Sequence, residues 1–192
     1  MLNIAWLNTS ALFLHVLAAI GLIAGGVVQV LAGTRLRRAV TTGAIESWAT
    51  FARSAGPLII VSAILSLFTG GHLAGAVYGG GDGNAFVDHP FITLGTVGLL
   101  LLAPVGPMVG GARLRRLAAA ARDHGEAAAP AELRAGATDP ALWGPVHSLV
   151  GVGVGFVWLM ITKPDWITGI AGLIVTFALG WGAGVVAARA GA

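Results

Sequence analysis

The sequence contains no cysteine, which excludes disulfide bridges, iron–sulfur clusters and thiol catalysis. Charge is also scarce, because only 10% of the 192 residues are Asp, Glu, Lys or Arg, against roughly a quarter in an ordinary soluble domain. Hydrophobic residues make up 56%, and the mean hydropathy is +0.86. This balance nearly rules out a soluble fold and predicts an integral membrane protein.

Uncharged runs of membrane-spanning length are abundant instead. A bilayer core takes about 20 apolar helical residues to cross. Five runs of about that length contain no Asp, Glu, Lys or Arg: 10–33, 56–77, 91–112, 142–161 and 166–188. A water-soluble helix of this length would carry a charged face. We therefore predict an all-α fold, in which residues 1–192 form a single domain, a bundle of five transmembrane helices in the lipid bilayer.

The basic residues are distributed unevenly between the connecting segments. Ten arginines lie between spans one and two, between spans three and four, or after span five, and only Lys163 lies on the other side. Because cytoplasmic loops retain Lys and Arg, we expect the N-terminus outside and the C-terminus in the cytoplasm, in a multi-pass protein of a bacterial-type cytoplasmic (inner) membrane. The pI near 10.6 then reports topology, and nucleic acid is not expected as a partner.

The sequence lacks the residues that several functional classes require. No carboxylate or lysine lies inside a span, and proton-coupled transporters usually carry such groups. The glycine-rich segment 79–84 has no following Gly-Lys-Ser/Thr, so it does not match a phosphate-binding loop. Span two carries hydroxyls at Ser62, Ser66 and Thr69 on one stripe. These hydroxyls would line a path for a small neutral solute or, alternatively, bond to carbonyls of the preceding turn.

Glycine is used at roughly twice its average frequency, with 30 residues, mostly inside the apolar runs. Small residues spaced by four allow close helix packing in lipid. The longest such ladder is in span five, at Thr168, Gly172, Thr176, Gly180 and Gly184. This ladder also supports a different function, in which a non-catalytic scaffold docks to itself or to a larger membrane complex.

Two further features concern the shape of the bundle. Pro104 and Pro107 predict a kink near the inner end of span three, because a proline inside a helix removes a backbone hydrogen bond. Between spans one and two, Ile45, Trp48 and Phe51 predict either a short helix lying at the membrane interface or a solvated connector.

Histidines are the ionisable residues at membrane depth. His15 in span one lies about 7 Å below the outer surface by helical rise, and His72 and His89 lie at the same side, with Met160 near the outer end of span four. Imidazole with thioether suits copper, and imidazole alone suits haem iron or zinc. These four residues are therefore a candidate outer metal site. The alternative is that His72 and His89 are interfacial loop residues and that His15 bonds to a neighbouring helix.

A second candidate lies nearer the inner face. His147 in span four is too far from His15 to share one ion, since a hydrocarbon core of about 30 Å leaves roughly 15 Å between them. Met108 reaches the depth of His147, and Gly151, one turn along, leaves room for a flat macrocycle. His147 and Met108 are a candidate axial pair for a haem, with ordinary helix packing as the alternative.

Two stretches resemble a known family. Residues 14–19 (Leu-His-Val-Leu-Ala-Ala), followed by Gly25 and Gly26, resemble the first span of copper-resistance D (CopD-like) bacterial membrane proteins. Residues 159–164 (Leu-Met-Ile-Thr-Lys-Pro) are similar to the Met-x-x-Lys-Pro ending of a span in a related uncharacterised family. The resemblance implies a histidine-bearing helical bundle with copper handling or haem binding. The only positions of this chain to which the resemblance assigns family residues are His15, Lys163 and Pro164.

The leading hypothesis is a membrane protein that binds haem b or a copper ion through the outer histidines, for electron transfer or metal handling. We do not expect an enzyme, and if the chain is one, it would be a haem-dependent membrane oxidoreductase. The scaffold or subunit of a larger complex is the alternative, and a passive channel is a third hypothesis.

Overall fold

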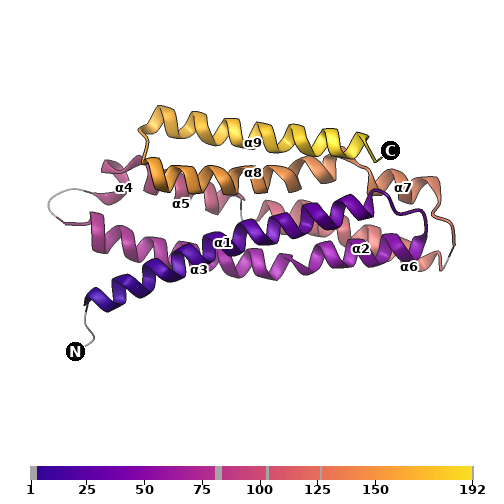
Figure 1. The fold of residues 1–192 in the computed structure, drawn as a ribbon, viewed down its shortest axis with the longest axis horizontal. Helices are drawn as coiled ribbons and strands as arrows, with labels where there is room; N and C mark the ends of the chain where they lie inside the picture. The colour runs from indigo at the N-terminus through magenta and orange to yellow at the C-terminus, as the bar shows by residue number, and fades with distance from the viewer. Residues whose placement is uncertain (1–3, 81–83, 103, 126, 192) are drawn as a thin grey trace.

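The computed structural model describes residues 4–80, 84–102, 104–125 and 127–191, and within these ranges the named secondary-structure elements are all helices. The helices are α1 (Ile4–Leu36), α2 (Thr42–Ser54), α3 (Gly56–Tyr78), α4 (Ala85–Asp88), α5 (Pro90–Leu102), the π-helix η1 (Gly106–Gly111), α6 (Ala112–Asp123), α7 (Ala131–Ala137), α8 (Pro140–Thr162) and α9 (Trp166–Arg189). The long helices α1, α3, α8 and α9 run along the length of the molecule (Figure 1). The α4 end lies opposite the end that contains α2, α6 and α7.

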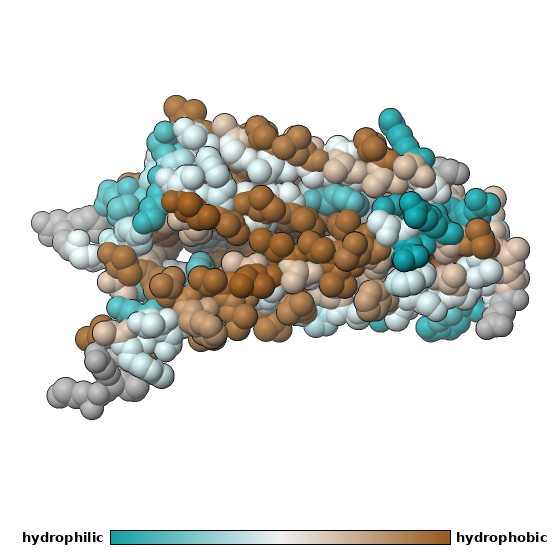
Figure 2. All heavy atoms as spheres, viewed as in Figure 1, coloured by the Kyte–Doolittle hydropathy of each residue, from teal (hydrophilic) through white to brown (hydrophobic). Residues whose placement is uncertain are grey.

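Four helical stretches are long and apolar enough to cross a membrane: Ile4–Leu36, Thr42–Tyr78, Ala131–Thr162 and Trp166–Arg189. Apolar side chains cover the middle of the visible face, and hydrophilic ones gather toward the ends (Figure 2). The prediction of an all-helical, multi-pass membrane protein is confirmed at this level.

The predicted third span, 91–112, is not one continuous α-helix. Helix α5 ends at Leu102, and the chain continues through Pro104 into η1 before α6 begins. Pro104 has no backbone N–H, and its ring clashes with the carbonyl four residues earlier. A π-helical turn is one of the usual ways in which a helix absorbs such a defect. The kink predicted from Pro104 and Pro107 falls at this interruption, which is more than a kink, and α5 alone, with 13 residues, is shorter than a membrane crossing.

The connector between α1 and α3 is the helix α2. Thr41 accepts a hydrogen bond from the backbone N–H of Ala44 at 3.3 Å and so caps its first turn. Ile45 and Ala49 are fully buried in a cluster that includes Leu114 and Leu117 of α6. Burying a side chain the size of Ile stabilises by about 1.5–3 kcal/mol. The solvated-connector alternative is therefore wrong, because the apolar face of α2 is covered by α6.

The small-residue face of α9 packs on α8 inside the molecule. A Cβ added at Gly180 would lie 2.6 Å from the carbonyl oxygen of His147, and one at Gly184 would clash with the carbonyl of Trp143. From the other side, a Cβ at Gly151 would clash with the carbonyl of Thr176. The ladder is thus used to bring two helices of this chain together, and it no longer favours docking to a partner.

Candidate functional site

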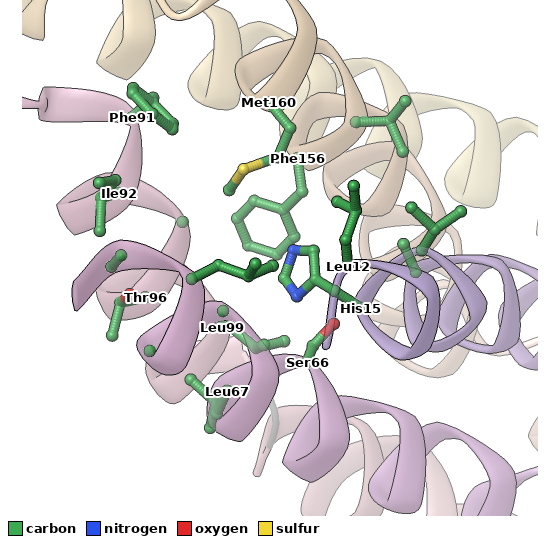
Figure 3. Close-up of a pocket in the computed structure, with 18 of the residues that line it drawn as sticks. Leu12, His15, Ser66, Leu67, Phe91, Ile92, Thr96, Leu99, Phe156 and Met160 are labelled. Atoms are coloured by element: carbon green, nitrogen blue, oxygen red, sulfur yellow. The ribbon is translucent and has the colours of Figure 1, made fainter. Parts of the chain in front are cut away.

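A cavity of about 760 Å³ lies between α1, α3, α5 and α8, toward the α4 end (Figure 3). Four glycines in its wall have no side chain to fill the space: Gly70, Gly71, Gly95 and Gly153. The wall is mainly apolar, and its polar side chains are those of Asn8, Thr9, His15, Ser66, Tyr78, Thr96 and Lys163. Sites for small molecules and cofactors typically measure about 300–1,000 Å³ and combine apolar walls with a few polar groups. The cavity has both properties.

His15 extends from α1 into this cavity, half-buried. Its Nδ1 lies 3.1 Å from the hydroxyl oxygen of Thr69, and the same oxygen lies 2.6 Å from the carbonyl oxygen of Leu65. A carbonyl only accepts, so the single hydroxyl proton of Thr69 is donated to Leu65. Thr69 therefore accepts from His15, and the ring proton is on Nδ1.

The consequence is a free lone pair on Nε2 of His15. In a neutral imidazole with the proton on Nδ1, Nε2 is an acceptor or a metal ligand. The ring of His15 also makes a hydrogen bond to the backbone of Ser66, whose carbonyl, like the Thr69 hydroxyl oxygen, accepts from the ring. In Figure 3 the ring of His15 lies in the cavity, with Ser66 of α3 on one side of it and Phe156 and Met160 of α8 on the other. A histidine held by its other nitrogen in this way is the usual arrangement of a metal-ligating imidazole.

Met160 lies in the wall that α8 contributes to the same cavity. It packs against a small buried cluster that contains Phe91 and Ile92. A Cβ added at Gly95 would lie 2.7 Å from the Met160 methyl carbon, so the glycine leaves space for the thioether. His15 and Met160 are the two predicted outer ligands that the structure places in one cavity.

The other two outer histidines lie outside the cavity wall. His72 is exposed, with Nε2 3.0 Å from the Asn8 side-chain oxygen. His89 packs its ring on Tyr78, with centroids 4.6 Å apart. Within the ranges that the structure describes, no three residues of the types His, Cys, Asp and Glu are grouped closely enough to hold a metal ion. The predicted four-residue outer set is therefore not gathered at one point here.

The inner pair is also not brought together. His147 donates from Nδ1 to the carbonyl of Trp143 at 2.9 Å, and it lines a smaller groove of about 270 Å³ beside Gly151 and Gly180. Met108 of η1 is 72% exposed and does not line that groove. His147 and Met108 as an axial pair stay a prediction from sequence.

The hydroxyl stripe of α3 is buried. Ser62 lies against Gly21 of α1, Ser66 lines the cavity, and Thr69 orients His15. The hydroxyl of Thr69 bonds to the carbonyl of Leu65 one turn earlier, as one of the two sequence interpretations predicted. The stripe therefore supports the cavity and the α1 contact.

Sequence reasoning missed two parts of the cavity. It did not connect Thr69 with His15, and it did not identify the rim that Tyr78, Phe91 and Lys163 form. Lys163 Nζ lies 5.5 Å from the ring centroid of Tyr78 and 5.8 Å from that of Phe91. The sequence singled out Lys163 by its side of the membrane and by the Lys-Pro pair after Met160, but no pattern connects it with Tyr78 and Phe91, which lie at the end of α3 and the start of α5.

Arg37 at the opposite end of the molecule was also missed. It is 8% exposed, its guanidinium carbon lies 4.7 Å over the Trp143 ring, and its Nη1 is buried without a hydrogen-bond partner. Burial, and secondarily the charge of Arg38, lowers the pKa of Arg37. Contact with the Trp143 ring stabilises the guanidinium by a cation–π interaction.

Comparison with protein-family models, curated proteins and solved structures finds no match to this chain. The resemblance to CopD-like proteins stays a prediction that rests on the two short stretches around His15 and Met160.

Proposed function

We propose that this protein holds haem b in the cavity between α1, α3, α5 and α8, with Nε2 of His15 as an axial ligand. The observation that carries the proposal is a lone pair of an imidazole, oriented by Thr69, facing a cavity of about 760 Å³ with a thioether in another wall. Histidine and methionine are both established axial ligands of haem iron. Haem bound in this way supplies one-electron transfer, which matches the expected role in electron transfer.

Haem fits this cavity better than copper does. Copper held by protein side chains alone needs several of them around one point, and His72 and His89 lie outside the cavity wall. Haem supplies four ligands of its own, so one or two protein side chains are sufficient. Copper handling by His15 and Met160 remains the alternative.

The chain's own residues have distinct tasks in this proposal. Thr69 keeps the proton of His15 on Nδ1 and so keeps Nε2 available for the iron. Gly70 leaves space for the imidazole of His15, since a Cβ at residue 70 would lie 3.0 Å from the His15 Cε1. The apolar walls exclude water, which tunes the reduction potential of a bound haem.

The membrane arrangement that we propose has five crossings in a bacterial-type inner membrane. The third crossing is the interrupted segment from Pro90 to Gly111, whose 22 residues would span about 33 Å as a helix, against a core of about 30 Å. Ten arginines at the α2–α6–α7 end favour that end as cytoplasmic, which places the cavity in the outer half.

The test is the visible absorption spectrum and metal content of the protein purified from cells supplied with haem precursor and copper. We expect a Soret band with about one haem per chain in the wild type and in His72→Ala and His89→Ala, and loss of the band in His15→Ala. Wild-type protein with neither a Soret band nor stoichiometric metal would overturn the proposal. Stoichiometric copper without haem would favour the alternative.

A further inference from the structure

Lys163 is the basic residue at the outer rim of the cavity. It occupies the turn between α8 and α9 with φ 47° and ψ 54°, a left-handed conformation usually taken by glycine. Its backbone N–H donates to the carbonyl of Leu159 at 2.9 Å, which ends α8. The side chain reaches back over Tyr78 and Phe91, so that the ammonium lies over the ends of α3 and α5.

The charge of Lys163 has no carboxylate partner among the described residues. The two ion pairs found there, Arg113–Asp139 and Arg122–Glu46, lie at the other end of the molecule. Asp165, two residues further on, uses its carboxylate to accept from the backbone N–H and the hydroxyl of Thr168, at 2.9 and 3.0 Å. Among the described residues, a cation is thus available at the opening of a mainly apolar cavity.

We infer that the ligand of this cavity is a lipid-soluble carboxylic acid, with its apolar body between the helices and its carboxylate at Lys163. The inference rests on the proposed function, because it needs the cavity to be a ligand site. An apolar wall recognises the body by burial, and the ammonium recognises the acid end by a charge-assisted hydrogen bond. Haem, with its propionates, and a long-chain fatty acid share this chemistry.

The experiment compares each acid with its ester, which removes the charge and keeps the apolar body. The probes are haem and haem dimethyl ester, followed by absorbance, and radiolabelled hexadecanoic acid and its methyl ester, followed by retention on the immobilised protein. We expect wild type to bind at least one acid about fivefold more tightly than its ester, the scale of one partly solvated ion pair. Lys163→Met removes this preference, and Lys163→Arg retains it.

The matched control is Arg134→Met, which deletes an exposed cation at the other end and leaves the preference unchanged. Lys163→Met places no new backbone demand on the left-handed turn, because Lys and Met both carry a Cβ. The thermal midpoint of the variant checks that the fold is retained. Equal binding of acids and esters by wild type, or a preference that survives Lys163→Met, overturns the inference.

The outcomes also separate this inference from the proposed function. His15-dependent haem binding with no preference over the ester keeps the proposed function and removes the role of Lys163. Lys163-dependent binding of the fatty acid without haem binding keeps the inference and removes haem. Binding of no probe removes both.

Discussion

At the scale of single residues, the chemistry of the cavity depends on which atom of His15 carries the proton. The Thr69 hydroxyl donates its proton to the carbonyl of Leu65, at 2.6 Å. In the 3.1 Å hydrogen bond between Thr69 and His15, the ring of His15 is therefore the donor. The type and depth of His15 could be predicted from the sequence. Its partner could not, because Thr69 lies 54 residues away and is selected by the rotation of α3 against α1.

Thr69→Val tests this dependence. Valine has nearly the same shape but accepts no hydrogen bond, so Nε2 is no longer kept as the lone-pair nitrogen. We expect haem affinity to fall by about 10–100-fold, the usual effect of removing the group that orients a ligating histidine. Titration of the purified protein with haem measures it. Thr96→Val is the control, since Thr96 lines the same cavity without bonding to His15, and an equal loss in both variants would contradict the role of Thr69.

At the scale of elements, α8 and α9 form a helix pair with direct backbone contact. The glycines that permit it lie on both helices, so neither can move away without losing packing on the other. The periodicity of small residues predicted that α9 has a packing face, but not that α8 covers it. A small-residue stripe is equally compatible with a neighbouring helix and with a second protein.

Gly180→Ala separates these two uses of the stripe. The new Cβ would lie 2.6 Å from the His147 carbonyl oxygen and 2.7 Å from the Ser148 Cα, and backbone cannot yield as a side-chain end can. We expect a loss of about 1–3 kcal/mol in stability, typical of overpacking, measured by unfolding in detergent. Gly182→Ala on the same helix meets nothing within 4 Å and should leave stability unchanged or slightly raised. Equal stability of the two variants would contradict a close backbone contact between α9 and α8 at Gly180.

The start of α9 predicts a pH dependence. Hydrogen bonds from Thr168, from its backbone N–H first and then from its hydroxyl, hold the pKa of the exposed Asp165 carboxyl below its ordinary value of 3.8. Because the folded-state pKa is the lower one, this cap stabilises fully above pH 3.8 and is lost as the pH falls through the folded-state value. We expect the thermal midpoint in detergent to fall with acid more in wild type than in Asp165→Asn. Parallel pH curves would show that the cap contributes nothing.

At the scale of the whole molecule, the two ends are built differently. The end with α2, α6 and α7 has a buried core of Leu, Ile and Ala, fully closed around Ile45, Leu114 and Trp143. The α4 end instead keeps a cavity, where glycines replace side chains between four helices. We expect the closed end to provide most of the rigidity and the open end to take the ligand.

The absence of cysteine in the chain makes the proposed orientation testable with single introduced cysteines. Gly80→Cys lies at the α4 end, where a Cβ meets nothing within 4 Å, and Ala135→Cys is exposed on α7 at the arginine-rich end. With the positive end inside, a membrane-impermeant maleimide should label Gly80→Cys in intact cells and Ala135→Cys only after permeabilisation. Labelling of both from outside, or the reverse pattern, would contradict the proposed topology.

The third predicted span shows how far prediction from sequence extends. The run 91–112 is uncharged and therefore predicted as a helix, and Pro104 and Pro107 predicted a kink near its inner end. The π-helix that follows depends on which backbone groups find partners after the break, and hydropathy carries no information about that. Predicted bounds such as 166–188 agree closely with α9, Trp166–Arg189, because Asp165, the charged residue before the apolar run, is also the cap that begins the helix.

The sequence by itself determined the class of protein, since apolar length and the scarcity of charge are properties of each segment taken alone. It also selected His15, His72, His89 and Met160 as candidate outer ligands from residue type and depth. Only the tertiary structure decided that His15 and Met160 share a cavity without His72 and His89, that Thr69 accepts from His15, that Lys163 lies at the rim and that the glycine ladder faces α8. Each of these depends on how helices far apart in the chain are rotated and packed against one another, and no local pattern encodes that rotation.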